Sequence, residues 1–69
     1  MYVQLCWKTK DTPKGKIHIS KDMTVKEAMK KYKEEIESHA TKAYLQYFDR
    51  WHWRIHKMLK EEKNESRAD

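Results

Sequence analysis

The only proline and the only glycine of this chain, Pro13 and Gly15, lie two positions apart. These residue types interrupt regular structure most strongly, and a pair of them so close together marks a turn. Before the turn, residues 2–9 alternate with the period of two that is typical of a strand, and residues 17–19 after it also alternate. The sequence therefore predicts a β-hairpin over residues 2–19.

A helix is predicted next, over residues 24–38. Its start carries a capping box, in which the Thr24 hydroxyl and the Glu27 carboxylate can each accept a hydrogen bond from the other residue's backbone N–H. Apolar side chains then recur at helical spacing and form one stripe: Val25, Ala28, Met29, Tyr32 and Ile36.

A second helix is predicted over residues 42–62. At 100° per residue, a large apolar and aromatic stripe forms along one side: Tyr44, Tyr47, Phe48, Trp51, Ile55, Met58 and Leu59. No glycine or proline separates this helix from the first, so one continuous helix in a dimerised chain is the alternative. The expected fold is α+β, in the order ββαα, with one domain over 1–62 and a frayed, charged tail over 63–69.

The predicted core joins both helices to the hairpin. Only ten of the 69 residues are Leu, Ile, Val or Phe, so this core is small and rich in aromatic residues. We expect it to contain Tyr44, Tyr47, Phe48, Trp51 and Ile55 from the second helix, with Val3, Leu5, Trp7, Ile17, Ile19, Val25, Met29, Tyr32 and Ile36.

A domain this short gains stability from association, and we expect a homodimer. An exposed edge of the strand at residues 2–8, paired across a two-fold axis, is one route to it. The single cysteine, Cys6, has no partner for an internal disulfide, which is typical of the reducing cytoplasm. No secretory signal follows Met1 and no run of 18 apolar residues occurs, so we expect a cytoplasmic protein without a membrane anchor.

The formal net charge of +5 is unevenly spread along the chain. Residues 1–21 carry five lysines against one aspartate, and residues 42–59 carry four cations against one aspartate. Positive charge so placed attracts nucleic acid, acidic proteins or anionic lipid.

Trp53 is the most informative residue for function. In the second predicted helix it points away from the apolar stripe, towards lysines and arginines. Exposed tryptophan among cations is typical of nucleic-acid binding, in which cations neutralise phosphates and an aromatic ring stacks on a base. It is equally typical of a hot spot for a protein partner, and a third possibility is that the ring simply packs against the hairpin or a second copy. The candidate contacts are Arg50, Trp53, Arg54, Lys57 and Lys60, with Lys8, Lys10, Lys14 and Lys16 from the hairpin.

Catalysis and metal binding find little support in the sequence. His52 and His56 have the helical spacing of two metal ligands, but no motif supplies a third, so no metal is predicted. A single glycine excludes a phosphate-binding loop, and Cys6 lacks the neighbours of a catalytic thiol. We expect no enzyme activity, no cofactor and no small-molecule substrate.

Short motifs between residues 3 and 35 favour DNA as the ligand. They are a tryptophan-bearing strand, a turn with Asp11, Gly15 and Lys16, a second strand, and a Thr-x-Lys-Glu-Ala helix start at residues 24–28. This combination resembles the arm-type DNA-binding module of phage tyrosine integrases. The resemblance implies DNA binding, although a clear third strand is missing and an aromatic segment follows where the integrase core would begin.

The sequence thus favours a small, basic, non-enzymatic regulatory module that contacts nucleic acid through a Trp/Arg/Lys helix face. The alternative is a small protein of the kind that phages and mobile elements use to bind and modulate a host protein, with Trp53 as its hot spot.

Overall fold

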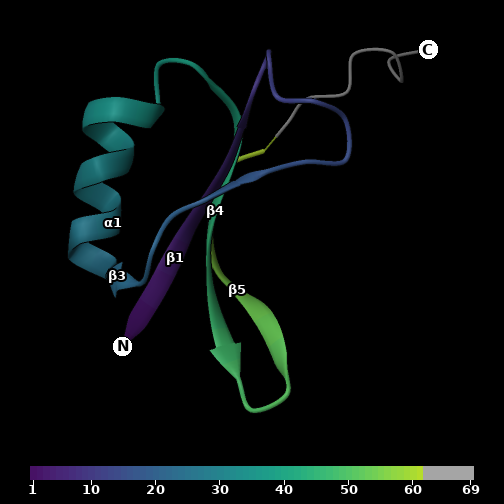
Figure 1. Ribbon diagram of the computed structural model, residues 1–69. Coiled ribbons are helices and arrows are strands. Elements are labelled where there is room, and N and C mark those ends of the chain that lie inside the picture. Colours follow the sequence, from purple (N-terminus) through teal and green to yellow (C-terminus); the bar gives the residue numbers. More distant parts are fainter. Residues whose placement is uncertain (62–69) are drawn as a thin grey trace.

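The structure, a computed structural model, describes residues 1–61 and consists of one antiparallel sheet with a short helix against it (Figure 1). In chain order the elements are β1 (Tyr2–Thr9), β2 (His18–Ile19), β3 (Met23–Thr24), α1 (Val25–Lys31), the π-helical turn η1 (Tyr32–Ile36), β4 (Ala40–Asp49) and β5 (His52–Lys60).

The sheet has the order β2-β1-β4-β5, and β3 also pairs with β1. β1 therefore has β2 and β3 along one edge and β4 along the other. Leu5 lies opposite Leu45, and Trp7 opposite Ala43. The predicted route to a dimer through the edge of β1 is wrong, because both of its edges have partners within the chain.

The predicted hairpin and its turn are confirmed. Cys6 of β1 pairs with Ile19 of β2 in antiparallel register. In the turn, the Lys16 backbone N–H donates to the Pro13 carbonyl at 3.0 Å, and Gly15 has a φ of 83°. Glycine adopts this left-handed conformation without the clash that a Cβ would cause, which explains its place in the turn.

The predicted capping box at the start of the helix is also confirmed. The Glu27 N–H donates to Thr24 Oγ1 at 3.2 Å, and the Thr24 N–H donates to Glu27 Oε1 at 3.1 Å. The helix ends two residues earlier than predicted, at Ile36 of η1. Beyond it, the Lys60 ammonium of β5 donates to the Glu37 and Ala40 carbonyls at 2.9 and 3.0 Å. This lysine therefore ties the end of the helical segment to β5.

The core lies between the helix and the face of the sheet that it covers. Leu5 and Leu45 are fully buried in the centre of the sheet, and Tyr32 and Ile36 of η1 pack onto this face. The complete cluster is Val3, Leu5, Met23, Ala28, Tyr32, Ile36, Ala40, Ala43 and Leu45.

The second predicted helix, 42–62, is wrong, and with it the ββαα order and the alternative of one continuous helix. This part of the chain instead forms the β4–β5 hairpin, with Arg50 and Trp51 as its two-residue turn. The segment is rich in aromatic and β-branched residues, which favour strands because their side chains pack well on a pleated surface. The predicted tail, residues 63–69, lies outside the described residues.

The predicted core is correct for the first half of the chain and wrong for most of the second. Val3, Leu5, Tyr32 and Ile36 are buried as expected. Ile19 is exposed. Three residues of the apolar and aromatic stripe of the second predicted helix are also exposed: Phe48, Trp51 and Ile55. The buried residues of β4 are instead the small or alternating ones, Ala40, Ala43 and Leu45, because a strand turns every second side chain to the same face.

Among residues 1–61, no helix is long and apolar enough to cross a membrane.

Candidate functional site

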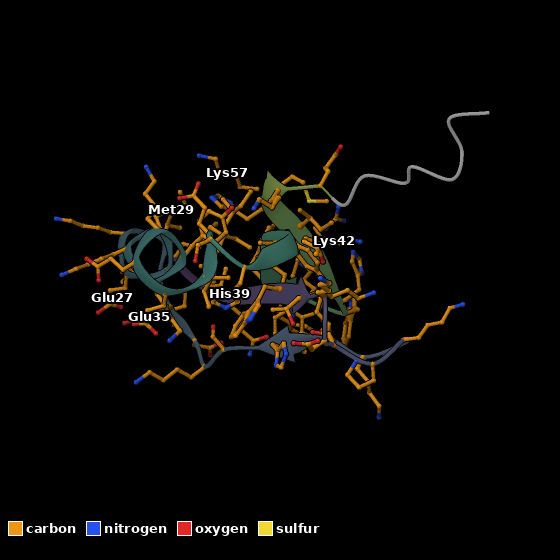
Figure 2. All side chains as sticks on the ribbon, turned by 90° about the horizontal axis from the view of Figure 1, so that it is seen from above. Glu27, Met29, Glu35, His39, Lys42 and Lys57 are labelled. Atoms are coloured by element: carbon orange, nitrogen blue, oxygen red, sulfur yellow. The ribbon has the colours of Figure 1, made fainter. Side chains whose placement is uncertain are left out.

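The face of the sheet opposite the helix has no element covering it in the part of the chain that is described (Figure 2). We call it the open face. Because cross-strand partners lie on the same side of a sheet, the register identifies its members. They include Gln4, Cys6 and Lys8 of β1, Ile19 of β2, Lys42, Tyr44, Gln46 and Phe48 of β4, and Trp53, Ile55 and Met58 of β5.

Two bulges in β5 affect which of its apolar and charged side chains lie on each face of the sheet. The register with β4 shifts between Ala43 and Tyr44 and again between Leu45 and Gln46. Such bulges place an extra residue in one strand and change the direction of the side chains that follow. Trp53 and Ile55 reach the open face as regular partners of Phe48 and Gln46, and the extra residue at His56 brings Met58 to the same face. The β5 cations Arg54 and Lys57 lie opposite Tyr47 and Leu45, on the helix side.

Aromatic side chains gather at the end of the β4–β5 hairpin, which we call the hairpin tip (residues 47–54). β4 pairs with β1 only as far as Gln46, so the tip extends past the rest of the sheet (Figure 1). Phe48 and Trp53 lie opposite each other with ring centroids 5.2 Å apart and planes at 67°. They are 55% and 48% exposed, and Trp51 in the turn is 85% exposed. Large exposed aromatic groups of this kind mark binding surfaces.

Positive charge lies at the other end of the open face. Lys8 of β1 and Lys42 of β4 are cross-strand partners, and the Lys42 ammonium lies 5.9 Å from the centroid of the Tyr44 ring. No carboxylate lies on the open face within residues 1–61. The acidic residues described are on the helical segment, in loops, at the end of β4 and just after β5: Asp11, Asp22, Glu27, Glu34, Glu35, Glu37, Asp49 and Glu61.

The candidate residues predicted from the sequence do not form one helical face. Trp53 lies on the open face as the cross-strand partner of Phe48, so the two side chains share one face instead of pointing to opposite sides of a helix. Lys57 lies on the helix side of the sheet and Lys42 on the other, as Figure 2 shows. Arg54 is also on the helix side, where its Nε donates to Asp49 Oδ2 at 2.8 Å.

The remaining candidates are placed by the turns and by β1. Arg50 occupies the hairpin turn with a φ of 58°. Lys60 is held by the Glu37 and Ala40 carbonyls, so its ammonium is engaged within the fold. Lys8 is on the open face, whereas three lysines lie in the loop between β1 and β2: Lys10, Lys14 and Lys16.

The sequence analysis missed Lys42 as a partner of Lys8. It assigned Phe48 and Ile55 to the core and Met58 to the apolar stripe of the second helix. The alternation of Lys42, Tyr44, Gln46 and Phe48 with Ala43, Leu45 and Tyr47 is the signal that could have separated the two faces of β4. The lysine pair itself depends on the register between β1 and β4, which no local pattern reveals.

Cys6 and Tyr44 are neighbouring titratable groups at the open face. Cys6 is fully buried there, and this burial raises the pKa of its thiol, so the protonated form dominates at neutral pH and is a poor nucleophile. Burial also raises the pKa of its neighbour Tyr44. His52 and His56 now lie on a strand, where a four-residue separation spans about 13 Å rather than one helical turn. Within residues 1–61 no cluster of metal-ligating side chains occurs.

Comparison of the chain with protein families, curated proteins and solved structures gives no match. The resemblance to the integrase arm-type module therefore remains one of short motifs. The geometry of the open face and the hairpin tip is the basis for a functional proposal.

Proposed function

We propose that this protein is a non-enzymatic nucleic-acid-binding module and that the open face of its sheet is the binding surface. The observation that carries the proposal is the composition of that face: exposed aromatic and apolar side chains, two lysines, and no carboxylate within the described residues. Lysines neutralise phosphates, and aromatic rings stack on bases with little regard to sequence.

The opposed lysines strengthen the proposal. Like charges directly across two strands destabilise a sheet by up to about 1 kcal/mol. The Lys8–Lys42 pair therefore lowers the stability of the free protein. A phosphate group placed near both ammonium groups would remove their repulsion and release counterions. The pair is therefore better suited to a polyanion than to free solution.

Binding is tested with fluorescently labelled DNA by anisotropy at low and physiological salt. The affinity should fall steeply with salt, because each phosphate contact adds about 0.7 to 0.9 to the slope of log K against log salt. The double variant Lys8→Ala/Lys42→Ala should bind more weakly and show a shallower slope.

Lys26→Ala/Lys33→Ala is the matched control. Both lysines are exposed on the helical segment, away from the open face, so the variant loses the same charge. It should bind nearly as well as the wild type. Equal losses in both double variants would show that net charge alone attracts DNA, and the open face would then not be the site.

A protein partner is the second candidate, because Phe48, Trp53, Ile55 and Met58 form a continuous exposed apolar surface over β4 and β5. Such a surface, with basic residues beside it, fits an acidic partner that buries Trp53 as a hot spot. Binding of this type would tolerate moderate salt and would collapse in Trp53→Ala. Retention of an acidic protein at physiological salt, with no DNA binding even at low salt, would favour this candidate.

A further inference from the structure

We propose that the open face accepts single-stranded nucleic acid, with unpaired bases stacked on the aromatic residues of the hairpin tip. This inference rests on the function proposed above and names its substrate class. It follows from the separation of charge and aromatic surface along the sheet.

The two ends of the face perform different tasks. Lys8 and Lys42 lie at one end, and Phe48 lies six residues along β4 at the other, a span of about 20 Å at the rise of an extended strand. Between the ends, Gln46 donates to Gln4 Oε1 at 3.0 Å, and the surface carries no full charge of its own. A strand of nucleic acid lying along β4 would thus contact the lysines at one end of the face and the aromatic rings at the other.

The aromatic end requires bases with free ring surfaces. In a duplex the rings are stacked on one another and only their edges face the grooves. Phe48 and Trp53 meet edge to face and leave about half of each side chain exposed, and Trp51 stands almost free in the turn. These rings would remain largely unused against duplex DNA, whereas an unpaired base can stack on them.

A second copy of the chain is a poorer occupant for the same surface. Packing two open faces together would bury Lys8 and Lys42 of each copy against a face that offers no carboxylate among the described residues. Buried charges without partners are strongly destabilising. The charge of the face therefore favours an anionic ligand over self-association.

The experiment compares three ligands of equal length, about 12 nucleotides: oligothymidine, its duplex with oligoadenosine, and an oligonucleotide of abasic sites. Binding to the full chain is followed by anisotropy and by quenching of tryptophan emission. Oligothymidine should bind at least about tenfold more tightly than either of the others and should quench the emission, because stacking contributes about 5- to 150-fold per base.

Trp53→Ala should weaken the binding of oligothymidine by a similar factor, leave the abasic ligand unaffected, and be partly rescued in Trp53→Phe. Trp7→Phe is the control, because Trp7 lies on the helix face, and this variant should keep both affinity and quenching. Circular dichroism shows that each variant is folded.

Three results would overturn the inference. Equal affinity for single strand and duplex, still dependent on Lys8 and Lys42, would leave the proposed function standing and remove only the single-strand preference. Unchanged affinity of Trp53→Ala for oligothymidine would also leave the proposed function standing and would remove the stacking of bases on the hairpin tip. Failure of every nucleic acid to bind at low salt would remove the proposed function as well.

Discussion

Lys8 and Lys42 lie directly opposite each other on the open face of the sheet, at its junction between β1 and β4. The carboxylates that could balance them are elsewhere among residues 1–61, on the helical segment, in loops and at strand ends. Like charges in this arrangement weaken strand pairing, and this unfavourable pair is what the proposed anionic ligand would relieve.

Lys8→Glu should stabilise the free protein while it weakens nucleic-acid binding. It replaces a repulsive cross-strand pair with an attractive one, which is worth roughly 0.2 to 1 kcal/mol in the free energy of unfolding. Urea unfolding and DNA anisotropy on the same samples measure the two effects. Lys21→Glu makes the same charge change in the loop before β3 and serves as the control. A loss of stability in Lys8→Glu would contradict the register between β1 and β4.

Leu45→Ala and Trp51→Ala should differ sharply in their effect on stability. Leu45 is fully buried, so its truncation should lower the free energy of unfolding by about 2 to 5 kcal/mol. Trp51 is 85% exposed, and its removal should change the free energy of unfolding by less than about 0.5 kcal/mol. Chemical denaturation measures both. A larger loss of stability in Trp51→Ala than in Leu45→Ala would contradict the β4–β5 hairpin, which buries Leu45 and exposes Trp51.

The first half of the fold could be predicted because its signals are local. The alternation of residues 2–9, the turn at Pro13 and Gly15, and the capping box of Thr24 and Glu27 each depend on neighbours in sequence, and all are present in the structure. Local hydrogen bonds and backbone preferences act before any distant contact forms, so they can be read directly from the chain.

The β4–β5 hairpin could not be predicted with equal security, because the segment carries two competing periodicities. Its large aromatic residues recur at helical spacing, whereas the smaller Ala43 and Leu45 alternate as in a strand. The turn at Arg50 lacks the glycine or asparagine that usually announces a hairpin. Pairing with β1 decides the outcome, and this tertiary contact overrides the local pattern. The open face was therefore beyond sequence reasoning, although Trp53 was correctly singled out as exposed.

Arg50→Gly should stabilise the hairpin turn. Arg50 has a φ of 58°, and the Trp51 N–H donates to the Asp49 carbonyl across it, so a residue with a Cβ is held in the left-handed region. This conformation costs roughly 1 kcal/mol more for such a residue than for glycine. The free energy of unfolding should rise by about that amount. Arg50→Ala keeps the strain but loses the charge, so its stability should stay near that of the wild type.

Lys60→Met should destabilise the protein without a specific effect on nucleic-acid binding. The Lys60 ammonium donates to the Glu37 and Ala40 carbonyls, and charged hydrogen bonds of this kind contribute about 1.5 kcal/mol or somewhat more. Thermal unfolding should show the loss. Lys57→Met, on the same strand but with an exposed side chain, should unfold close to the wild-type temperature. If Lys60→Met instead kept full stability and lost DNA affinity, Lys60 would be a phosphate contact as the sequence suggested.

The free energy of unfolding should fall at alkaline pH, in part through Cys6. Burial raises the pKa of this thiol above its ordinary value of 9.0, so the folded state retains the proton to a higher pH than the unfolded chain does. The resulting stabilisation is complete below pH 9 and is lost as the pH rises through the folded-state pKa.

Urea unfolding at pH 7.5 and pH 9.5 measures this loss, which should be smaller in Cys6→Ala. Tyr44 and Tyr32, whose pKa values burial also raises, begin to contribute only nearer their ordinary value of 10.0. An identical alkaline loss in Cys6→Ala would show that the tyrosines, and not the thiol, carry the pH dependence.

Reaction of Cys6 with a thiol reagent at neutral pH should be slow until denaturant opens the sheet, because the folded chain both buries and protonates the sulfur.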